Sequence, residues 1–376
     1  MQRPGGRPRY TGPIVDATPA ATGADLGQLE HDALATLVES LGQRRFHADQ
    51  IYRWIWARGV TDPAAMTDLP RALREALSSS AVVRTPAVVR RDRSADGTQK
   101  FVLGLADGRQ IEAVFIPETP KQTFCISTQV GCAMGCAFCL TGRMGLVRHL
   151  DAGEIAGQVR VLARELDMLG APFNIVLMGM GEPLHNYDET MKALRLLADP
   201  RGLGLSPRRV TLSTVGLVPM LDKLAAEPLM PNLAISLHAT TNAQRAAIVP
   251  PTRKYPLEDI LDACRRFPVH KRSRITFEYV LLDGVNDSPE DARRLVRLLA
   301  GVRAKVNLIP LNAAAGIPFE RPSDARVDRF AAILADRGMV VSVRKSRGRD
   351  IRAACGQLIV EGQGRRSPAQ QLADAL

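Results

Sequence analysis

Three cysteines with the spacing C-x-x-x-C-x-x-C are the residues of this chain best suited to chemistry. Cys132, Cys136 and Cys139 lie in the stretch CISTQVGCAMGCAFC at 125–139, which Cys125 opens. Clustered thiolates bind soft metals. A structural zinc takes four ligands, and Cys125 or a histidine could complete such a set. A 4Fe-4S cluster has four irons, so three cysteines would leave one iron open for a substrate or cofactor.

Apolar strand candidates alternate with helical segments around this loop. The runs TFCIST, FNIVLMG, RVTLST, NLAISL, RITFEYVL and KVNLIP predict strands, with MVVSVR as a late addition. One intervening helix begins at Asp151, and Glu154 completes a capping box. Continuous apolar strands that alternate with helices predict a buried parallel sheet. The expected fold class is α/β, with a partial (β/α)6 barrel.

Polar residues follow several of these strands at the point where each ends. The cysteine loop follows the first strand, and GMGEP, TVG, HAT and LNA follow later ones. In α/β barrels the carboxyl ends of the strands build the active site. These positions therefore predict one functional face, which favours a reactive cluster over a structural zinc.

Five segments are expected along the 376 residues. Residues 1–24 are rich in Gly, Pro, Ala and Thr and are predicted to be disordered. Residues 25–83 predict a small helical accessory domain, and 84–118 a short β extension in which ADG occurs twice as a turn signal. The barrel is expected over 119–345, followed by a C-terminal segment over 346–376.

The overall charge is strongly basic. Lys and Arg number 50 against 39 Asp and Glu, a formal net charge of +11, which suits an RNA or other polyanionic partner as well as a merely basic enzyme. We find no run of about 18 apolar residues and no secretory signal, so no membrane span is expected. Clustered cysteines are not a disulfide framework, and we expect a cytoplasmic protein.

The cysteine spacing after the first barrel strand resembles the radical S-adenosylmethionine (SAM) superfamily. In that superfamily SAM chelates the open iron of the cluster, and an electron from the cluster cleaves it to a 5'-deoxyadenosyl radical. GMGEP at 179–183 is similar to the motif that binds the SAM amino group.

A larger set of motifs resembles one family within that superfamily, the dual-specificity RNA adenine carbon-2 methyltransferases. These motifs, spread over roughly residues 30–360, are CISTQVGCAMGCAFC, VLMGMGEPLHNYD, VTLSTVG, AISLHAT, NLIPLN and SRGRDIRAACGQL. The resemblance implies methylation of an adenosine in large-subunit (23S) ribosomal RNA and of the adenosine next to the anticodon in some transfer RNAs. It also implies one 4Fe-4S cluster, two SAM molecules per turnover and a reducing electron-donor system. We expect a monomer.

The resemblance implies an indirect chemistry, because carbon-2 of adenine is a poor nucleophile. One SAM methylates a cysteine, and a radical from a second SAM removes a hydrogen from that S-methyl group. The resulting carbon radical adds to the adenine, which ties the RNA to the protein. A base then removes the ring proton, and a second cysteine attacks the first sulfur to release methylated RNA and leave a disulfide.

The family's functional positions can be matched residue by residue. Cys355 matches the methyl-carrying cysteine, Cys125 the resolving cysteine and Glu112 the proton acceptor. The cluster ligands match Cys132, Cys136 and Cys139. The SAM-site positions match Gly181, Glu182, Ser213, Ser236, Leu237, His238 and Asn312.

Each of these residues also has an ordinary structural interpretation. A lone Cys355 or Cys125 would be a small buried hydrophobe, as we expect for Cys264 in a helical pattern. Glu112 alternates with apolar neighbours, so a solvated strand face is the default. Only the combination of motifs favours the functional assignment.

Two alternative functions stay open at this point. A sister enzyme methylates carbon-8 of ribosomal adenosine with the same pair of cysteines. An RNA-binding protein with a structural zinc belongs to a different class and would be colourless rather than brown. A methylthiotransferase is disfavoured because we find no second cysteine triad.

Overall fold

The computed structural model describes residues 23–117, 122–269 and 273–360. The predicted disordered segment 1–24 falls almost entirely outside the described residues, as does the end of the C-terminal segment from residue 361 onward. No helix in the described part of the chain is long and apolar enough to cross a membrane.

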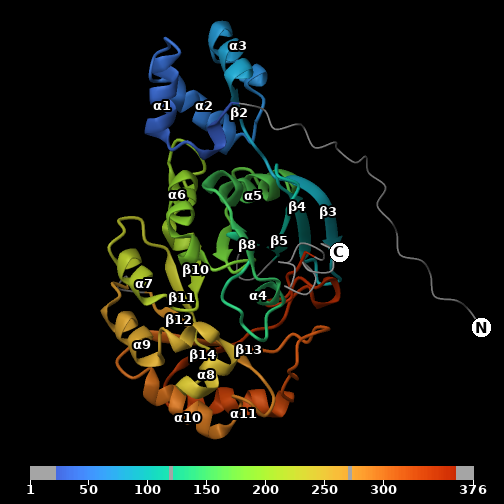
Figure 1. The fold of residues 1–376 in the computed structure, drawn as a ribbon, viewed down its shortest axis with the longest axis vertical. Helices are drawn as coiled ribbons and strands as arrows, with labels where there is room; N and C mark the ends of the chain where they lie inside the picture. Colours follow the sequence, from blue (N-terminus) through green and yellow to red (C-terminus); the bar gives the residue numbers. More distant parts are fainter. Residues whose placement is uncertain (1–22, 118–121, 270–272, 361–376) are drawn as a thin grey trace, which may run out of the picture.

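A helical module lies at one end of the molecule (Figure 1). Gly42 and Gly59, both with positive φ, follow its first two helical stretches, as the sequence predicts. A parallel pair of short strands, β1 and β2, joins the start and end of the module. Its elements are β1 (Ala24–Asp25), η1 (Leu26–Gln28), α1 (His31–Ser40), α2 (His47–Tyr52), the π-helical turn η2 (Arg53–Ala57), η3 (Pro63–Ala65), α3 (Arg71–Ser80) and β2 (Ala81–Val82).

In the described residues, seven parallel strands form one side of a ten-stranded sheet. They occur in sequence order and end at an open edge at β14, so the sheet does not close into a full barrel. Every predicted apolar run supplies one of them, which confirms the expected α/β partial barrel. The strands are β6 (Thr123–Cys125), β9 (Asn174–Leu177), β10 (Val210–Thr214), β11 (Asn232–Ser236), β12 (Ile275–Leu281), β13 (Ala304–Pro310) and β14 (Val340–Val343).

The β extension continues the same sheet rather than forming a separate one. Strands β3 (Ala87–Arg93), β4 (Gln99–Gly104) and β5 (Gln110–Ile116) are antiparallel, and β5 pairs with β6 so that Val114 lies opposite Cys125. The two ADG turns connect these strands, where Gly97 and Gly108 have positive φ.

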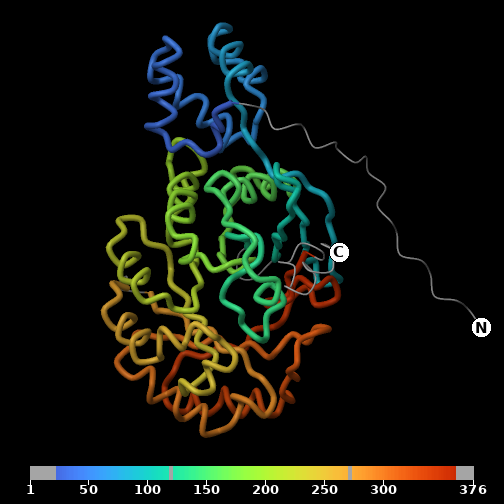
Figure 2. Tube along the Cα trace, viewed as in Figure 1, coloured from blue at the N-terminus to red at the C-terminus, as the bar shows by residue number. Residues whose placement is uncertain are grey.

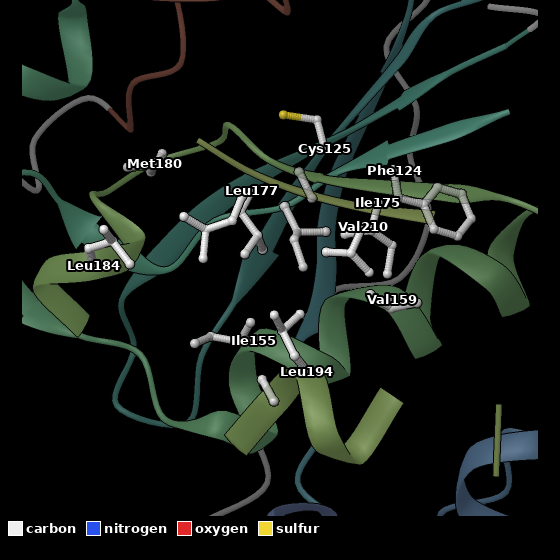
Figure 3. Packing of buried hydrophobic residues seen from close by; sticks show 14 of the residues in the cluster. Phe124, Cys125, Ile155, Val159, Ile175, Leu177, Met180, Leu184, Leu194 and Val210 are labelled. Carbon is white, nitrogen blue, oxygen red and sulfur yellow. The ribbon is translucent and has the colours of Figure 1, made fainter. Parts of the chain in front are cut away.

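Helices cover the outside of the parallel strands (Figure 1). Figure 3 shows Ile155 and Leu194 on the helical side of the strands, while the Cys125 side chain points to the opposite side. The predicted capping box of Asp151 and Glu154 is present. The helices are α5 (Ala152–Glu165), α6 (Tyr187–Ala198), α7 (Val218–Ala225), α8 (Asn242–Ile248), α9 (Leu257–Arg266), α10 (Pro289–Leu298) and α11 (Asp324–Ala335), with 3-10 turns η4 (Pro183–Asn186), η5 (Pro207–Arg209) and η6 (Pro250–Arg253).

The cysteine loop has secondary structure of its own that the sequence did not predict. Strands β7 (Gln129–Gly131) and β8 (Leu146–His149) pair as an antiparallel hairpin, and the short helix α4 (Leu140–Met144) lies between them. The hairpin was missed because each strand is only three or four residues long and Gly131 interrupts the apolar pattern.

After β14 the chain passes close to the cysteine loop and the β extension (Figure 2). Near the 3-10 turn η7 (Arg349–Ile351), the Asp350 carboxylate accepts hydrogen bonds from the Ser94 hydroxyl at 2.5 Å and the Ala95 N–H at 3.2 Å. The Gly348 N–H donates to Asp96 at 3.0 Å. The first ADG turn therefore fixes the start of the segment that carries Cys355.

Replacing Asp350 should loosen this segment without unfolding the barrel. Loss of the Ser94 and Ala95 hydrogen bonds in Asp350→Ala removes about 1 kcal/mol of local stability, which predicts roughly fivefold faster tryptic cleavage near Arg349. Asp336→Ala, at an exposed aspartate after α11, is the matched control. Equal cleavage rates in both variants would show that these contacts do not hold the segment.

Candidate active site

A cavity of about 160 Å³ opens at the carboxyl ends of the parallel strands. Its wall combines the cysteines of the predicted cluster motif with predicted SAM-site residues from later parts of the sequence. Parallel strands bring their carboxyl ends to one edge of a sheet, so the loops after β6, β9, β10, β11 and β13 meet here. The predicted residues in the wall are Cys132, Cys136, Cys139, Gly181, Glu182, Ser213, Ser236, His238, Asn312 and Cys355.

The three cysteines of the motif line one wall of the same cavity. Burial raises the pKa of the Cys136 thiol, and the neighbouring Cys139 and Cys132 raise it further. Among the described residues, no group of three or more His, Cys, Asp or Glu side chains could hold a single metal ion. A cubane cluster places each cysteine on a different iron, whereas zinc needs all its ligands around one centre. Three cysteines are the ligand number of a 4Fe-4S cluster with one open iron, and one fewer than a structural zinc usually takes.

The GMGEP turn after β9 is fixed by close backbone packing. Gly181 has φ +107°, and a Cβ there would lie 2.8 Å from the Gln129 nitrogen. The buried Glu182 carboxylate accepts from the N–H groups of Leu184 at 3.0 Å and Val215 at 2.9 Å. Burial raises the pKa of Glu182 to about 7. Each carboxylate oxygen accepts one protein N–H and keeps capacity for a second hydrogen bond from a ligand in the cavity.

His238 presents a defined tautomer to the cavity. Its Nδ1 accepts a hydrogen bond from the Val280 N–H at 3.0 Å, so the ring proton must be on Nε2. Burial, with a smaller contribution from the Arg245 guanidinium, lowers the pKa of the imidazole to about 3. The ring lies edge-on to Phe138, within the cysteine loop, at 4.8 Å between centroids. His238 is therefore a neutral hydrogen-bond donor beside the three thiols.

Other polar groups of the cavity wall could form hydrogen bonds with a ligand. The hydroxyls of Ser213 and Ser236 lie 3.4 Å apart at the ends of β10 and β11. The Asn312 Oδ1 is buried and has no hydrogen-bond partner among the described residues, so it can accept from a donor in the cavity. Leu237 differs, because it is fully buried and absent from the cavity wall.

Cys125 and Cys355 line a second, smaller cavity of about 20 Å³, although 230 positions separate them in the sequence. Burial is the main cause that raises the pKa of the Cys125 thiol to about 12; Cys355 contributes to this rise and Arg344 opposes it. Arg344 and Cys355 line both cavities. The structure thus brings the two predicted reactive cysteines together beside one guanidinium.

Backbone contacts hold Cys355 at the junction of the two cavities. The Asn312 side-chain amide donates to the Cys355 carbonyl at 3.2 Å. The next residues bond to the cysteine loop, where Leu140 N–H donates to the Gly356 carbonyl at 2.8 Å and Thr141 Oγ1 to that of Leu358 at 2.6 Å. Cys355 is therefore held between the cluster loop and the loop after β13.

Glu112 is buried rather than solvated, which overturns the default interpretation of its strand pattern. It is 1 % exposed and forms an ion pair with Lys100 at 2.8 Å. Its other oxygen accepts from the Ile359 N–H at 2.8 Å. Burial raises the pKa of the Glu112 carboxyl, and Lys100 opposes that rise. Glu112 shares the sheet face of Cys125 but is absent from the walls of both cavities.

Two charged residues of the cavity wall were missed from the sequence. Glu278, in the middle of β12, is 5 % exposed and accepts from Asn307 at 2.7 Å. Arg344 follows β14 directly. A charged residue inside an otherwise apolar strand was the available signal for Glu278, whereas Arg344 resembles its many exposed neighbours. Cys264 is buried in α9, as expected.

Comparison with known proteins agrees with this geometry. Residues 126–296 match the family model "Radical SAM superfamily", and residues 24–83 match "Ribosomal RNA large subunit methyltransferase N-terminal domain". A dual-specificity RNA methyltransferase RlmN of Anaeromyxobacter dehalogenans is 50% identical, covering 94% of this chain and 96% of that protein. One of Syntrophobacter fumaroxidans is 48% identical, covering 86% of this chain and 94% of that protein.

A solved structure is similar over nearly the same span. The crystal structure of a radical SAM methyltransferase from Sphaerobacter thermophilus has a TM-score of 0.85 and 45% identity, covering 89% of this chain and 99% of that one. Extensive identity, both family models and the three-cysteine cavity point the same way. The chain therefore belongs to the radical SAM superfamily and, within it, to the RlmN family of dual-specificity RNA methyltransferases.

Proposed function

We propose that this enzyme methylates carbon-2 of a specific adenosine in 23S ribosomal RNA and of the adenosine next to the anticodon in some transfer RNAs. The observation that carries the proposal is the convergence of Cys125 and Cys355 beside a cavity lined by the three clustered cysteines. Carbon-2 lacks the nucleophilicity for direct methyl transfer, so a cysteine that carries the methyl group and a second that releases it are needed.

Cys132, Cys136 and Cys139 would hold one 4Fe-4S cluster. One SAM would supply the methyl group. The cluster and a reducing system would supply the electron that turns a second SAM into the radical that removes hydrogen, so each turnover would use two SAM molecules. The residues that would bind SAM are Gly181, Glu182, Ser213, Ser236, His238 and Asn312. Asn312 Oδ1 supports this assignment, since a buried acceptor without a partner is costly unless a ligand completes it.

Cys355 would carry the methyl group, because it lines both cavities and can face SAM on one side and Cys125 on the other. Cys125 would then attack the Cys355 sulfur and form a disulfide as the methylated RNA leaves. Arg344 lies near both thiols, and its positive charge opposes the rise that burial causes in the pKa of the Cys125 thiol, whose thiolate is the nucleophile.

Glu112 would accept the ring proton of the adenine. Its pairing with Lys100 supports this role, since a nearby ammonium favours the ionised carboxylate that a base requires. Because the Ile359 N–H covers its other oxygen, the C-terminal segment must shift before Glu112 can reach a substrate.

The RNA would contact the helical module as well as the cavity. Arg44 and Arg45 are exposed between α1 and α2, and Phe46 is 50 % exposed. Cations that neutralise phosphates and an aromatic side chain for stacking are features of RNA-binding surfaces. We place the enzyme in the cytoplasm as a monomer.

Mass spectrometry of RNA tests the proposed reaction. Unmodified 23S RNA and transfer RNA are incubated with reconstituted enzyme, SAM and a reductant, and the nucleosides are then separated. We expect 2-methyladenosine in both RNAs and none with Cys355→Ala. A product of 8-methyladenosine would instead assign the chain to the sister activity.

Cys125→Ala should trap the RNA on the protein. Without the resolving thiol the bond between Cys355 and the adenine persists, so we expect a covalent protein–RNA adduct on a denaturing gel. Cys264→Ala, at a cysteine buried in α9, should give free product as the wild type does. If Cys125→Ala carries methylated Cys355 but yields no adduct, Cys125 is not the resolving residue.

Lys100→Met should destabilise the protein by about 3 kcal/mol, because it leaves the buried Glu112 carboxylate without its partner. Urea unfolding measures this loss. The deficit should shrink as the pH falls, since the raised pKa of Glu112 lets the folded state bind a proton first. Adding Glu112→Gln should restore most of the stability, and no recovery would show that Lys100 acts through other contacts.

A further inference from the structure

A buried arginine lies behind the cavity wall, and the proposed function gives it no role. Arg245, on α8, is 0% exposed. Its guanidinium donates to the carbonyls of Leu237 at 2.9 Å, Ser236 at 3.0 Å and Val215 at 2.6 Å. A fourth bond reaches the Thr252 hydroxyl at 3.0 Å. The hydrogen bonds of this side chain are therefore well satisfied.

The positive charge of Arg245, in contrast, is not balanced. Its four hydrogen-bond acceptors are neutral, and no carboxylate within the described residues lies within ion-pair distance of it. A buried charge without a counter-ion costs several kcal/mol even when it is hydrogen-bonded. Burial lowers the pKa of Arg245 to about 10, and the electrostatic effect of Cys136, in the cluster motif, opposes that fall.

Arg245 also connects the two halves of the site. The carbonyls it binds belong to the ends of β10 and β11, where Ser236 lines the cavity and the Val215 N–H holds Glu182. At the end of α8, the Ile248 carbonyl accepts from the Ala137 N–H at 2.9 Å, inside the cysteine motif. One short helix thus contacts both the SAM-site strands and the cluster loop.

We propose that Arg245 is the fixed counter-charge of the iron–sulfur cluster and favours its reduced state. This inference rests on the proposed function for the identity of the cluster. Three thiolates give the bound cluster a net negative charge, which increases by one when it takes an electron from the reductant. A buried cation nearby stabilises the reduced state more than the oxidised state, because little water screens the interaction.

Redox titration followed by electron paramagnetic resonance tests the proposal. At the same applied potential, Arg245→Gln should show about a tenfold lower ratio of reduced to oxidised cluster, which is 59 mV for a one-electron couple. Arg245→Lys keeps the charge and should stay near the wild type. An unchanged ratio in Arg245→Gln, or an equal loss in Arg245→Lys, would overturn the proposal.

Arg160→Met is the matched control. Arg160 is likewise buried, at 2 % exposed, but it lies over Trp56 at 5.0 Å, against the helical module. Loss of this charge should lower stability without changing the reduced fraction of the cluster. A similar shift in Arg160→Met would mean that any buried charge has this effect, and the specific role of Arg245 would be wrong.

Thermal unfolding of the cluster-free protein provides a second measurement. If the cluster is what balances Arg245, the empty protein gains nothing from the charge, and Arg245→Gln should be at least as stable as Arg245→Lys. Failure of Arg245→Gln to fold without the cluster, while Arg245→Lys folds, would therefore contradict the proposal.

These readouts separate the inference from the proposed function. Wild-type protein that binds no iron would refute the cluster assignment, and with it both proposals. Wild-type protein that binds the cluster but makes no methylated adenosine would refute only the proposed function, because the reduced fraction does not depend on RNA.

Discussion

The common direction of the parallel strands from β6 to β13 is the constraint on which the site depends. Because these strands run in one direction, the loops that follow them emerge at a single rim. Residues as distant as Cys132 and Asn312 therefore share one cavity wall. The segment that carries Cys355 then passes this rim and places its thiol in the same cavity wall.

The second constraint is the junction between parallel and antiparallel pairing at β6. On one side β6 pairs with β9, as in any barrel of this class, and on the other it pairs with β5. This arrangement leaves the Cys125 side chain on the inner face, away from the helices (Figure 3). It also places Glu112 and Lys100 on the same sheet as the reactive cysteine.

Much of the fold could be predicted because its signals are local. Largely apolar runs of six to eight residues mark each parallel strand, the ADG turns mark the hairpins, and Asp151 with Glu154 marks the start of α5. The cluster motif and GMGEP were also local. These features depend on neighbours within a few positions, which a single sequence contains.

The remaining features depend on contacts between distant segments. For Glu112 the strand pattern alone favours a solvated face as the default interpretation, but the C-terminal segment covers its carboxylate through the Ile359 N–H. Arg245 looks like any basic residue of a short helix, and only the packing of α8 behind β10 and β11 buries it. Arg344 likewise lines both cavities only because the distant segments that carry Cys125 and Cys355 fold against it.

The small cavity around Cys125 and Cys355 has a consequence for how the enzyme is reset. Its volume of about 20 Å³ is enough for one water molecule and far too small for a thiol reductant. A disulfide formed there would join the buried Cys125 to the half-buried Cys355. A reductant would therefore find Cys355 the more accessible of the two cysteines, and the route back to the reduced enzyme would run through the C-terminal segment that carries it.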